Sequence, residues 1–504
     1  MVKIILFIAA AMIGLVLFIK NRPRSYPSIL MPKEQATAVA ADYLQLLCGL
    51  DVSGWRAYGM YWNDRETVNR LHHLNMLDRL RSVLYQWGLV ESWRIRFVKQ
   101  GSSVAVGINA KGEITFLHVD AGAQRLASSQ SLMAKKTPAE IKSILDRNKN
   151  GLWGNAKITG EGIREEDLSD IVTYWYMQES AEIRMKLSVQ TQENCLVRIL
   201  SETEILTETM GKVVRQEFRD SALNLSGFVG SFLSTIAGVL LLIYVEGAHQ
   251  SLLSLGIGLV IAAAVLLTVN NDISMSIVNA FDSRLTIKSV YAIGIVSAVV
   301  ASIAYGSMAF ITSLAGVKLA VGQSLLLFDS AFLQITIGCC SALAALGGFA
   351  FIFKLLESKG VVRISPELSD RSIFLSGFRL KQCLSISLQS SILEEIIFRL
   401  LGISTLLWFL QNEWLAVAIT SILWAFLHQG SGYNPGWIRW AQLVVFGIFL
   451  GFIFIHYGFL AVIVAHFVHN FVLLSIPILY YKLQLKNTIG VKEEPSAHHS
   501  YINK

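Results

Sequence analysis

Two adjacent glutamates and an arginine stand inside a segment that is otherwise apolar enough to cross a membrane. The segment reads SSILEEIIFRLLG, and its charged residues are Glu394, Glu395 and Arg399. A charged side chain at the centre of a bilayer costs about 2.5–3.5 kcal/mol on insertion scales. Three such charges therefore indicate either an ion pair that holds helices in register or a site that performs chemistry.

The spacing of the three charges suggests different tasks for the two glutamates. Glu395 and Arg399 are four residues apart with the acid first, which is the favourable order for an ion pair along a helix. Adjacent helical residues project about 100° apart, so Glu394 is free to face a cavity. Taken alone, the segment fits a structural buried ion pair almost as well as a catalytic site.

Two further apolar segments contribute polar side chains at a similar depth. The segment SILWAFLHQG places His428 at the end of one span, and AVIVAHFVHNFVLL carries His466 and Asn470 four residues apart on one helical face. Polar groups that are costly in lipid must contact one another or water. The economical arrangement is one polar cavity lined by three helices.

Hydrolysis is the chemistry that such a cavity suits. A carboxylate in an apolar site holds a proton more tightly and can act as a general base on water. One histidine can orient that water or bind a metal. A second histidine and an asparagine amide can donate hydrogen bonds to a developing oxyanion.

The three motifs together resemble those of the CPBP family, the intramembrane CAAX-protease and bacteriocin-processing (Abi) enzymes. EEIIFR matches the EExxxR motif of that family, and HFVHN matches HxxxN. WAFLH is similar to FxxxH, with Trp424 in the aromatic position and His428 as the histidine. The resemblance covers about residues 381–481.

The resemblance implies a role for each matched residue. Glu394 would be the general base that activates water, assisted by His428, while Glu395 and Arg399 would position it. The two residues of the HxxxN motif, His466 and Asn470, would form the oxyanion hole.

The resemblance leaves metal dependence open, since the family is commonly labelled as metalloproteases, and the preferred mechanism requires no cofactor. The alternative is a zinc or another divalent ion held by Glu394, His428 and His466, with one position left open for water. His469 adds a nitrogen three residues after His466, but the sequence contains no HExxH motif.

The expected function is an intramembrane endopeptidase that hydrolyses membrane-associated or C-terminal CAAX-like substrates. Its partners would be a peptide or membrane-protein substrate and the lipid bilayer. Two alternatives stay open: a transporter that uses Glu394 and the histidines as a proton relay, and a catalytically silent scaffold. The net charge of +7 is the Lys and Arg excess expected of cytoplasmic loops, so nucleic-acid binding is excluded.

The composition is typical of a membrane protein. Of the 504 residues, 53% are hydrophobic and 16% are charged, and the mean hydropathy is +0.50. Soluble domains are about 25% charged. The five cysteines form no CxxC pair, so neither a disulfide framework nor a zinc ribbon is expected.

The expected fold class is mainly α, a polytopic membrane helical bundle with an inserted α+β extramembrane domain. Residues 1–24 form an N-terminal anchor, 25–225 the α+β domain, 226–483 the protease-like bundle and 484–504 a polar tail. About eight spans are expected in addition to the anchor, near residues 226–246, 250–270, 287–314, 324–353, 383–410, 413–430, 438–457 and 459–481.

The polar N-terminal part carries both helical and strand patterns. KEQATAVAADYLQLL predicts an amphipathic helix, and NAKG between two alternating runs predicts a hairpin. TPAEIKSILDRN begins with a capping box of Thr137 and Glu140, which predicts a second helix. SAEIRMKLSVQ and CLVRILSETEI then predict another strand pair. The repeated order of helix and strand pair suggests an internal duplication.

The distribution of Lys and Arg predicts the orientation in a cell membrane. Basic residues flanking spans mark the cytoplasmic side. Counting back from the basic loop 354–381 places the whole α+β domain on that side as well. The basic residues of that loop are Lys354, Lys359, Arg363, Arg371, Arg379 and Lys381.

Overall fold

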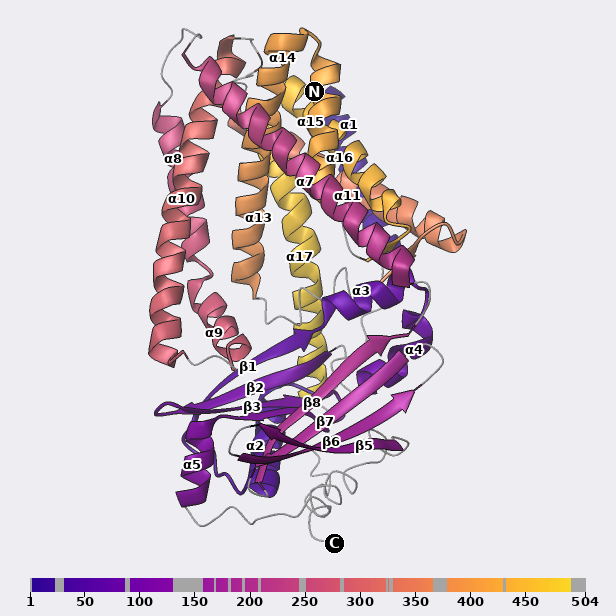
Figure 1. Ribbon diagram of the computed structural model, residues 1–504. Helices are drawn as coiled ribbons and strands as arrows, with labels where there is room; N and C mark the ends of the chain where they lie inside the picture. Colours follow the sequence, from indigo (N-terminus) through magenta and orange to yellow (C-terminus); the bar gives the residue numbers. More distant parts are fainter. Residues whose placement is uncertain are drawn as a thin grey trace.

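A bundle of long helices lies against an antiparallel sheet that carries its own short helices (Figure 1). The computed structural model describes residues 2–22, 31–86, 91–129, 157–166, 169–179, 183–192, 195–206, 210–243, 251–281, 285–322, 325, 330–365, 379–428 and 432–490. The helix predicted from Thr137 and Glu140 lies outside these described residues.

The helical bundle confirms the predicted polytopic architecture. Among the described residues, seven helical segments are long and apolar enough to cross a membrane. They are Ile4–Asn21, Val213–Leu241, Ser251–Asn279, Ile287–Gly322, Ala331–Ser358, Trp437–Tyr457 and Phe459–Tyr480. The predicted span 383–410 corresponds to a helix interrupted by a π-helical segment, and the predicted span 413–430 corresponds to a shorter apolar helix.

The bounds of the bundle helices differ in places from the predicted spans. The helices are α1 (Val2–Asn21), α7 (Met210–Leu241), α8 (Ser251–Leu266), α9 (Val269–Asn279), α10 (Ile287–Gly322), α11 (Ala331–Ser358), α13 (Leu380–Glu394), the π-helix η1 (Glu395–Ile403), α14 (Ser404–Leu410), α15 (Glu413–Leu427), α16 (Trp437–Tyr457) and α17 (Phe459–Gly490). Helix α7 begins well before the expected span because its first turns are polar and contact the sheet domain. Its 32 residues extend about 48 Å.

The N-terminal helix is part of the bundle and not a peripheral tether. It packs along α11, and Phe7 lies edge-on against Tyr457 of α16. The backbones of α1 and α11 touch where Gly14 meets Gly347. A Cβ atom on Gly14 would overlap the carbonyl oxygen of Leu343, and one on Gly347 would overlap the backbone of Gly14. Small residues allow this close approach, as is usual between membrane helices.

The extramembrane part is built on one eight-stranded antiparallel sheet in the order β1-β2-β3-β4-β8-β7-β6-β5. Its strands are β1 (Arg56–Asn63), β2 (Glu91–Lys99), β3 (Ser102–Ile108), β4 (Ile114–Val119), β5 (Lys157–Glu166), β6 (Ser169–Glu179), β7 (Ile183–Gln192) and β8 (Cys195–Ile205). Two four-stranded meanders therefore meet at β4 and β8, where only Leu117 with Ile199 and His118 with Arg198 are paired.

Several local predictions for this part are confirmed. Helix α2 (Lys33–Cys48) buries Ala36, Ala40 and Leu44 at four-residue spacing, and it ends at Gly49 in the left-handed region with φ of 61°. The NAKG segment forms the turn between β3 and β4, with the Gly112 N–H donating to the Asn109 carbonyl. Strands β7 and β8 pair as expected. Strands β1, β5 and β6 were not anticipated, and the internal duplication stays a prediction.

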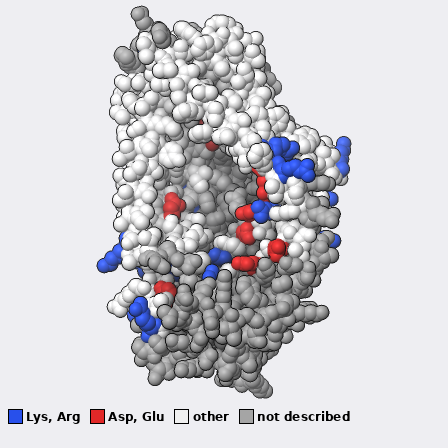
Figure 2. Space-filling view, viewed as in Figure 1, with Lys and Arg blue, Asp and Glu red and all other residues white. Residues whose placement is uncertain are grey.

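Three polar contacts among the described residues illustrate how the sheet domain is joined to the bundle. Arg96 of β2 donates to the Ile277 carbonyl of α9 at 2.6 Å. Arg70 of α3 (Arg65–His73) pairs with Glu217 of α7 at 3.0 Å. The third contact joins the turn after α3 to the small sheet of β9 (Arg363–Ile364) and β10 (Tyr433–Asn434). Figure 2 shows the surface hollowed above the sheet, between α10 and α7, with Asp and Glu side chains along the border of the hollow.

Candidate active site

The paired glutamates lie where an α-helix changes into a π-helix. Helix α13 ends at Glu394, and η1 begins at Glu395 and continues to Ile403. A π-helix forms i→i+5 hydrogen bonds in wider turns, and such segments occur frequently at functional sites. The change in winding therefore falls between the two acids, and their side chains enter different surroundings.

Glu395 belongs to a completely buried ionic network. The Arg399 Nη1 donates to its Oε1 at 3.0 Å, and both side chains have no exposed area. The His466 Nδ1 lies 2.6 Å from the same oxygen. The second guanidinium nitrogen of Arg399 donates to the Gly447 carbonyl of α16 at 3.3 Å. The carboxylate of Glu395 thus links η1 to α17 through His466. The guanidinium of Arg399 links η1 to α16 through the Gly447 carbonyl.

Glu394 has a different environment and stays partly accessible. Its Oε2 accepts a hydrogen bond of 2.6 Å from the indole N–H of Trp424 on α15. The same oxygen lies 3.6 Å from the His428 Nε2 and 3.9 Å from the His466 Nε2. The side chain of Glu394 is 21% exposed and that of His428 is 35% exposed. Glu394 is therefore the accessible acid and Glu395 the sealed one.

The hydrogen bonds assign a tautomer to each histidine. The His428 Nδ1 is 2.9 Å from the Trp424 carbonyl, which can only accept, so Nδ1 carries the proton. The His466 Nδ1 faces the Glu395 carboxylate and donates to it for the same reason. When a ring is neutral, it then presents its Nε2 lone pair toward Glu394. Two imidazole acceptors and one carboxylate oxygen converge, an arrangement suited to a water molecule that donates protons.

Asn470 lies one turn beyond His466 on α17, but its amide has a different partner. Its Nδ2 donates to the Ser390 Oγ of α13 at 3.0 Å. Ser390 stands four residues before Glu394 and hence on the same side of α13. The structure thus brings all six predicted residues to the contact region of α13, η1, α15 and α17. It holds the Asn470 amide one turn away from Glu394.

Trp424 contributes more to the site than its sequence position suggested. Besides its bond to Glu394, its ring lies 4.8 Å from the Arg399 guanidinium and packs edge-on against His466. Phenylalanine at this position would keep the ring contacts but has no N–H to donate. The sequence signal for this role is the tryptophan at a motif position where the family has phenylalanine, because tryptophan adds an N–H donor that phenylalanine lacks.

The residues offered as metal ligands do not form a compact cluster. In the described part of the chain, no group of three or more His, Cys, Asp and Glu side chains is placed to hold a metal ion. His469 points elsewhere, because its ring packs 4.4 Å from the Phe446 ring. Glu394 Oε2 accepts from Trp424 and lies 3.6 and 3.9 Å from the Nε2 atoms of His428 and His466.

Comparison with known proteins identifies the family. Residues 377–472 match the family described as type II CAAX prenyl endopeptidase Rce1-like. The chain belongs to this CPBP family of intramembrane proteases. It is 43% identical over 474 residues to the sporulation-killing factor biosynthesis protein SkfC of Bacillus subtilis (strain 168), covering 94% of this chain and 95% of that protein. The similarity therefore extends through the sheet domain, which the three motifs do not cover. No solved structure matches the chain.

Proposed function

We propose that the protein is an intramembrane endopeptidase in which Glu394 activates the attacking water. The observation that carries the proposal is the convergence of the Glu394 Oε2 with the Nε2 atoms of His428 and His466. A water there would donate one hydrogen to the carboxylate and one to a histidine. A carboxylate with this accessibility next to an apolar helix surface can serve as the general base.

The reaction follows from these positions. Glu394 removes a proton from water while the water oxygen attacks the scissile carbonyl carbon, and the carbonyl π electrons move onto its oxygen. Cleavage of the carbon–nitrogen bond then needs a proton on the leaving amine, which the protonated Glu394 returns. His428 orients the water, and its tautomer is fixed by the Trp424 carbonyl.

Stabilisation of the oxyanion is assigned to the second histidine. His466, when protonated, donates from Nε2, while its Nδ1–H remains bonded to Glu395. The carboxylate behind the ring stabilises the imidazolium, and Arg399 holds that carboxylate in place. Asn470 joins as a second donor by exchanging its Ser390 partner for the substrate oxygen. Preorganised donors of this kind contribute a few kcal/mol in other enzymes.

The decisive variant is Glu394→Gln, which keeps the side-chain shape and removes the base. We expect peptide cleavage to fall by about 10²–10⁴-fold, the usual contribution of general-base catalysis. The assay is cleavage of quenched fluorogenic peptides, with and without a farnesylated C-terminal CAAX box, by the purified full-length protein. Glu357→Gln, an exposed acid at the end of α11, is the matched control. Cleavage by Glu394→Gln at the wild-type rate would remove Glu394 from the mechanism.

The proposed mechanism requires no cofactor, and its alternative is a zinc or another divalent ion at Glu394, His428 and His466. The two are separated by dialysing the purified protein against a chelator and then adding zinc. Unchanged activity after chelation supports the metal-free mechanism. Activity that is lost and then restored by the metal supports the alternative.

The substrate we propose is the precursor of a peptide killing factor. This rests on the name of the relative, which assigns it to the biosynthesis of a sporulation-killing factor, combined with membership in a protease family. A protease in such a pathway would cleave a membrane-associated precursor. We place the protein in the cell membrane with the sheet domain in the cytoplasm, which is the orientation that the basic loops favour.

A further inference from the structure

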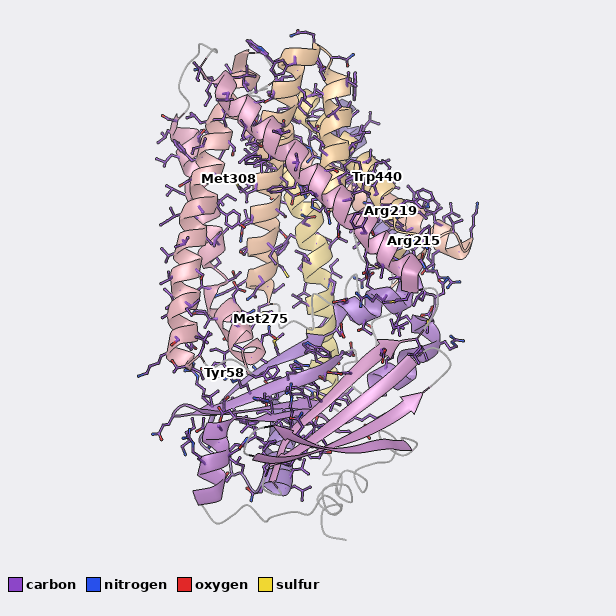
Figure 3. The ribbon with its side chains drawn as sticks, viewed as in Figure 1. Tyr58, Arg215, Arg219, Met275, Met308 and Trp440 are labelled. Atoms are coloured by element: carbon purple, nitrogen blue, oxygen red, sulfur yellow. The ribbon has the colours of Figure 1, made fainter. Side chains whose placement is uncertain are left out.

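A large cavity lies at the junction of the sheet and the bundle, apart from the candidate active site. Its volume is about 910 Å³, within the range of small-molecule sites. The walls come from β1, β2, β3, the start of α5 (Ala121–Ser129) and the connection between α9 and α10. None of the six candidate site residues lines it. Tyr58, one of its lining residues, is labelled in Figure 3 where the sheet meets the lower ends of α9 and α10.

The charges that line this cavity are mostly positive. Four cations come from β1, β2 and α10: Arg56, Arg96, Lys99 and Lys288. The lining contains one acid, Asp120, whose two carboxylate oxygens accept from the backbone N–H groups of Ser103 and Ala123. Because four cations face a single carboxylate, the cavity presents an excess of positive charge to a ligand.

Arg96 is the fixed element of the cavity. It is 4% exposed, and its Nη atoms donate to the Ile277 carbonyl and to the Ser103 Oγ at 2.6 and 3.0 Å. Its Nε has no hydrogen-bond partner among the described residues. Burial lowers the pKa of this guanidinium, and the nearby Asp120 carboxylate opposes that shift. The hydrogen bonds of Arg96 go to neutral groups, so its positive charge is held in a fixed position at the cavity wall.

The position of the cavity indicates which kind of anion it receives. Lys288 stands in the first turn of α10, a helix long and apolar enough to span a membrane, so the cavity opens at the end of that helix which adjoins the sheet domain. Phe281 and Leu285 add apolar surface beside the cations. Basic pockets next to membrane helices attract anionic lipid headgroups. A ligand with a phosphate and an apolar body matches this wall better than a purely acidic peptide.

We propose that the cavity binds the headgroup of an anionic phospholipid and thereby holds the sheet domain against the membrane surface. Arg56, Lys99 and Lys288 would contact the phosphate. Arg96 keeps the cavity in shape by linking β2 to α9. This proposal is independent of the peptidase mechanism, because lipid binding needs none of the residues around Glu394.

The test is a binding measurement on the full-length protein in a maltoside detergent. Short-chain phosphatidylglycerol and phosphatidylcholine with identical acyl chains are titrated, and bound lipid is read by native mass spectrometry. The cavity variant combines Arg56→Gln, Lys99→Gln and Lys288→Gln. A control variant removes the same charge elsewhere through Lys111→Gln, Arg215→Gln and Lys359→Gln. We expect the wild type and the control to prefer phosphatidylglycerol, and the cavity variant to bind it about tenfold more weakly or worse.

Several outcomes would overturn the lipid assignment. Equal binding of both lipids, or an unchanged affinity in the cavity variant, would do so. Glycerol 3-phosphate binding as tightly as the lipid would assign the cavity to a soluble phosphate compound. Competition by an acidic peptide, without lipid binding, would assign it to a peptide. The single variant Lys288→Gln, in the exposed first turn of α10, gives the same comparison if the triple variant does not fold.

Discussion

The two neighbouring glutamates lie on either side of a change in helical winding, and their side chains enter different surroundings. Glu395 is enclosed with Arg399 and His466, and Glu394 reaches Trp424 and a partly open space. A sealed carboxylate bonded to a cation can position other groups but cannot meet a substrate. The accessible one can, because its oxygen is within reach of water.

Trp424 offers a direct test of the contact that holds Glu394. Trp424→Phe restores the aromatic residue of the family motif but removes the N–H that donates to the carboxylate. A hydrogen bond to a charged group contributes about 1.5–3 kcal/mol, so we expect cleavage to fall by about tenfold or more, together with some loss of thermal stability because the tryptophan is buried. Trp440→Phe is the control, since Trp440 stacks on Phe426 outside the site. Equal activities of both variants would show that the indole bond is dispensable.

The buried network predicts a stability effect that single and double variants resolve. Arg399→Met leaves the Glu395 charge uncompensated, and breaking such a pair costs about 3–5 kcal/mol. The double variant Glu395→Leu with Arg399→Met removes both charges and should recover part of the lost thermal stability. It should not recover cleavage, because His466 loses the carboxylate behind its ring. The measurement is thermal unfolding in detergent together with the peptide assay.

The sequence predicted part of this site and left out the rest for a physical reason. The ion pair of Glu395 and Arg399 follows from spacing along one helix, and the depth of His428 and His466 follows from span boundaries. The bond from the His466 Nδ1 to Glu395 and the one from Trp424 to Glu394 depend on how α15 and α17 are placed around α13. Spacing within one helix contains no information about that lateral placement.

At the scale of elements, the bundle was easier to predict than the sheet. Crossing a bilayer demands about 20 apolar residues, a signal that few other structures produce. Strand β5, with the sequence KITGEGIREE, lacks the strong apolar alternation that marks a strand. The pairing of β4 with β8 joins segments separated by the second meander and could not be read from local patterns.

The close crossing of α1 and α11 predicts that Gly14 cannot be replaced by a larger residue without loss of stability. Gly14→Leu would place a side chain where the Leu343 carbonyl and the Ala344 backbone lie, so the helices must separate. We expect a loss of about 1–3 kcal/mol or more, the usual effect of overpacking, and a lower yield of folded protein. Ile13→Leu changes an exposed neighbour on the same helix and should behave as the wild type. Equal stability of the two variants would contradict the close packing.

At the scale of the whole molecule, the sheet domain contacts the segment that follows His428. Asn75 accepts from Arg363 at 2.7 Å and from Asn434 at 3.1 Å, so one side chain joins the turn after α3 to both strands of the β9–β10 pair. Asn434 also donates to the His72 carbonyl. The segment carrying β10 therefore connects His428 to a surface of the extramembrane domain.

This contact predicts that a change in the sheet domain alters catalysis without touching the site. Asn75→Gly removes the accepting side chain and retains the positive φ of 58° that the turn requires. We expect a few-fold lower kcat, with faster hydrogen exchange in residues 432–437. Gln411→Gly, at another positive φ in the turn between α14 and α15, is the control. Unchanged exchange in Asn75→Gly would show that the domain does not order this segment.

The α1–α11 crossing also sets a requirement on how the protein is made. Residues 14 and 347 are 333 positions apart, and at roughly 5–20 residues per second a ribosome needs about 20–70 s to bridge them. Throughout that interval α1 sits in the membrane without the helix it will finally contact. Its glycine-bearing surface is then open to the α11 of another chain as well as to its own. Whether α1 pairs with its own α11 or with that of another chain therefore depends on how fast the chain is synthesised and on the local concentration of nascent chains.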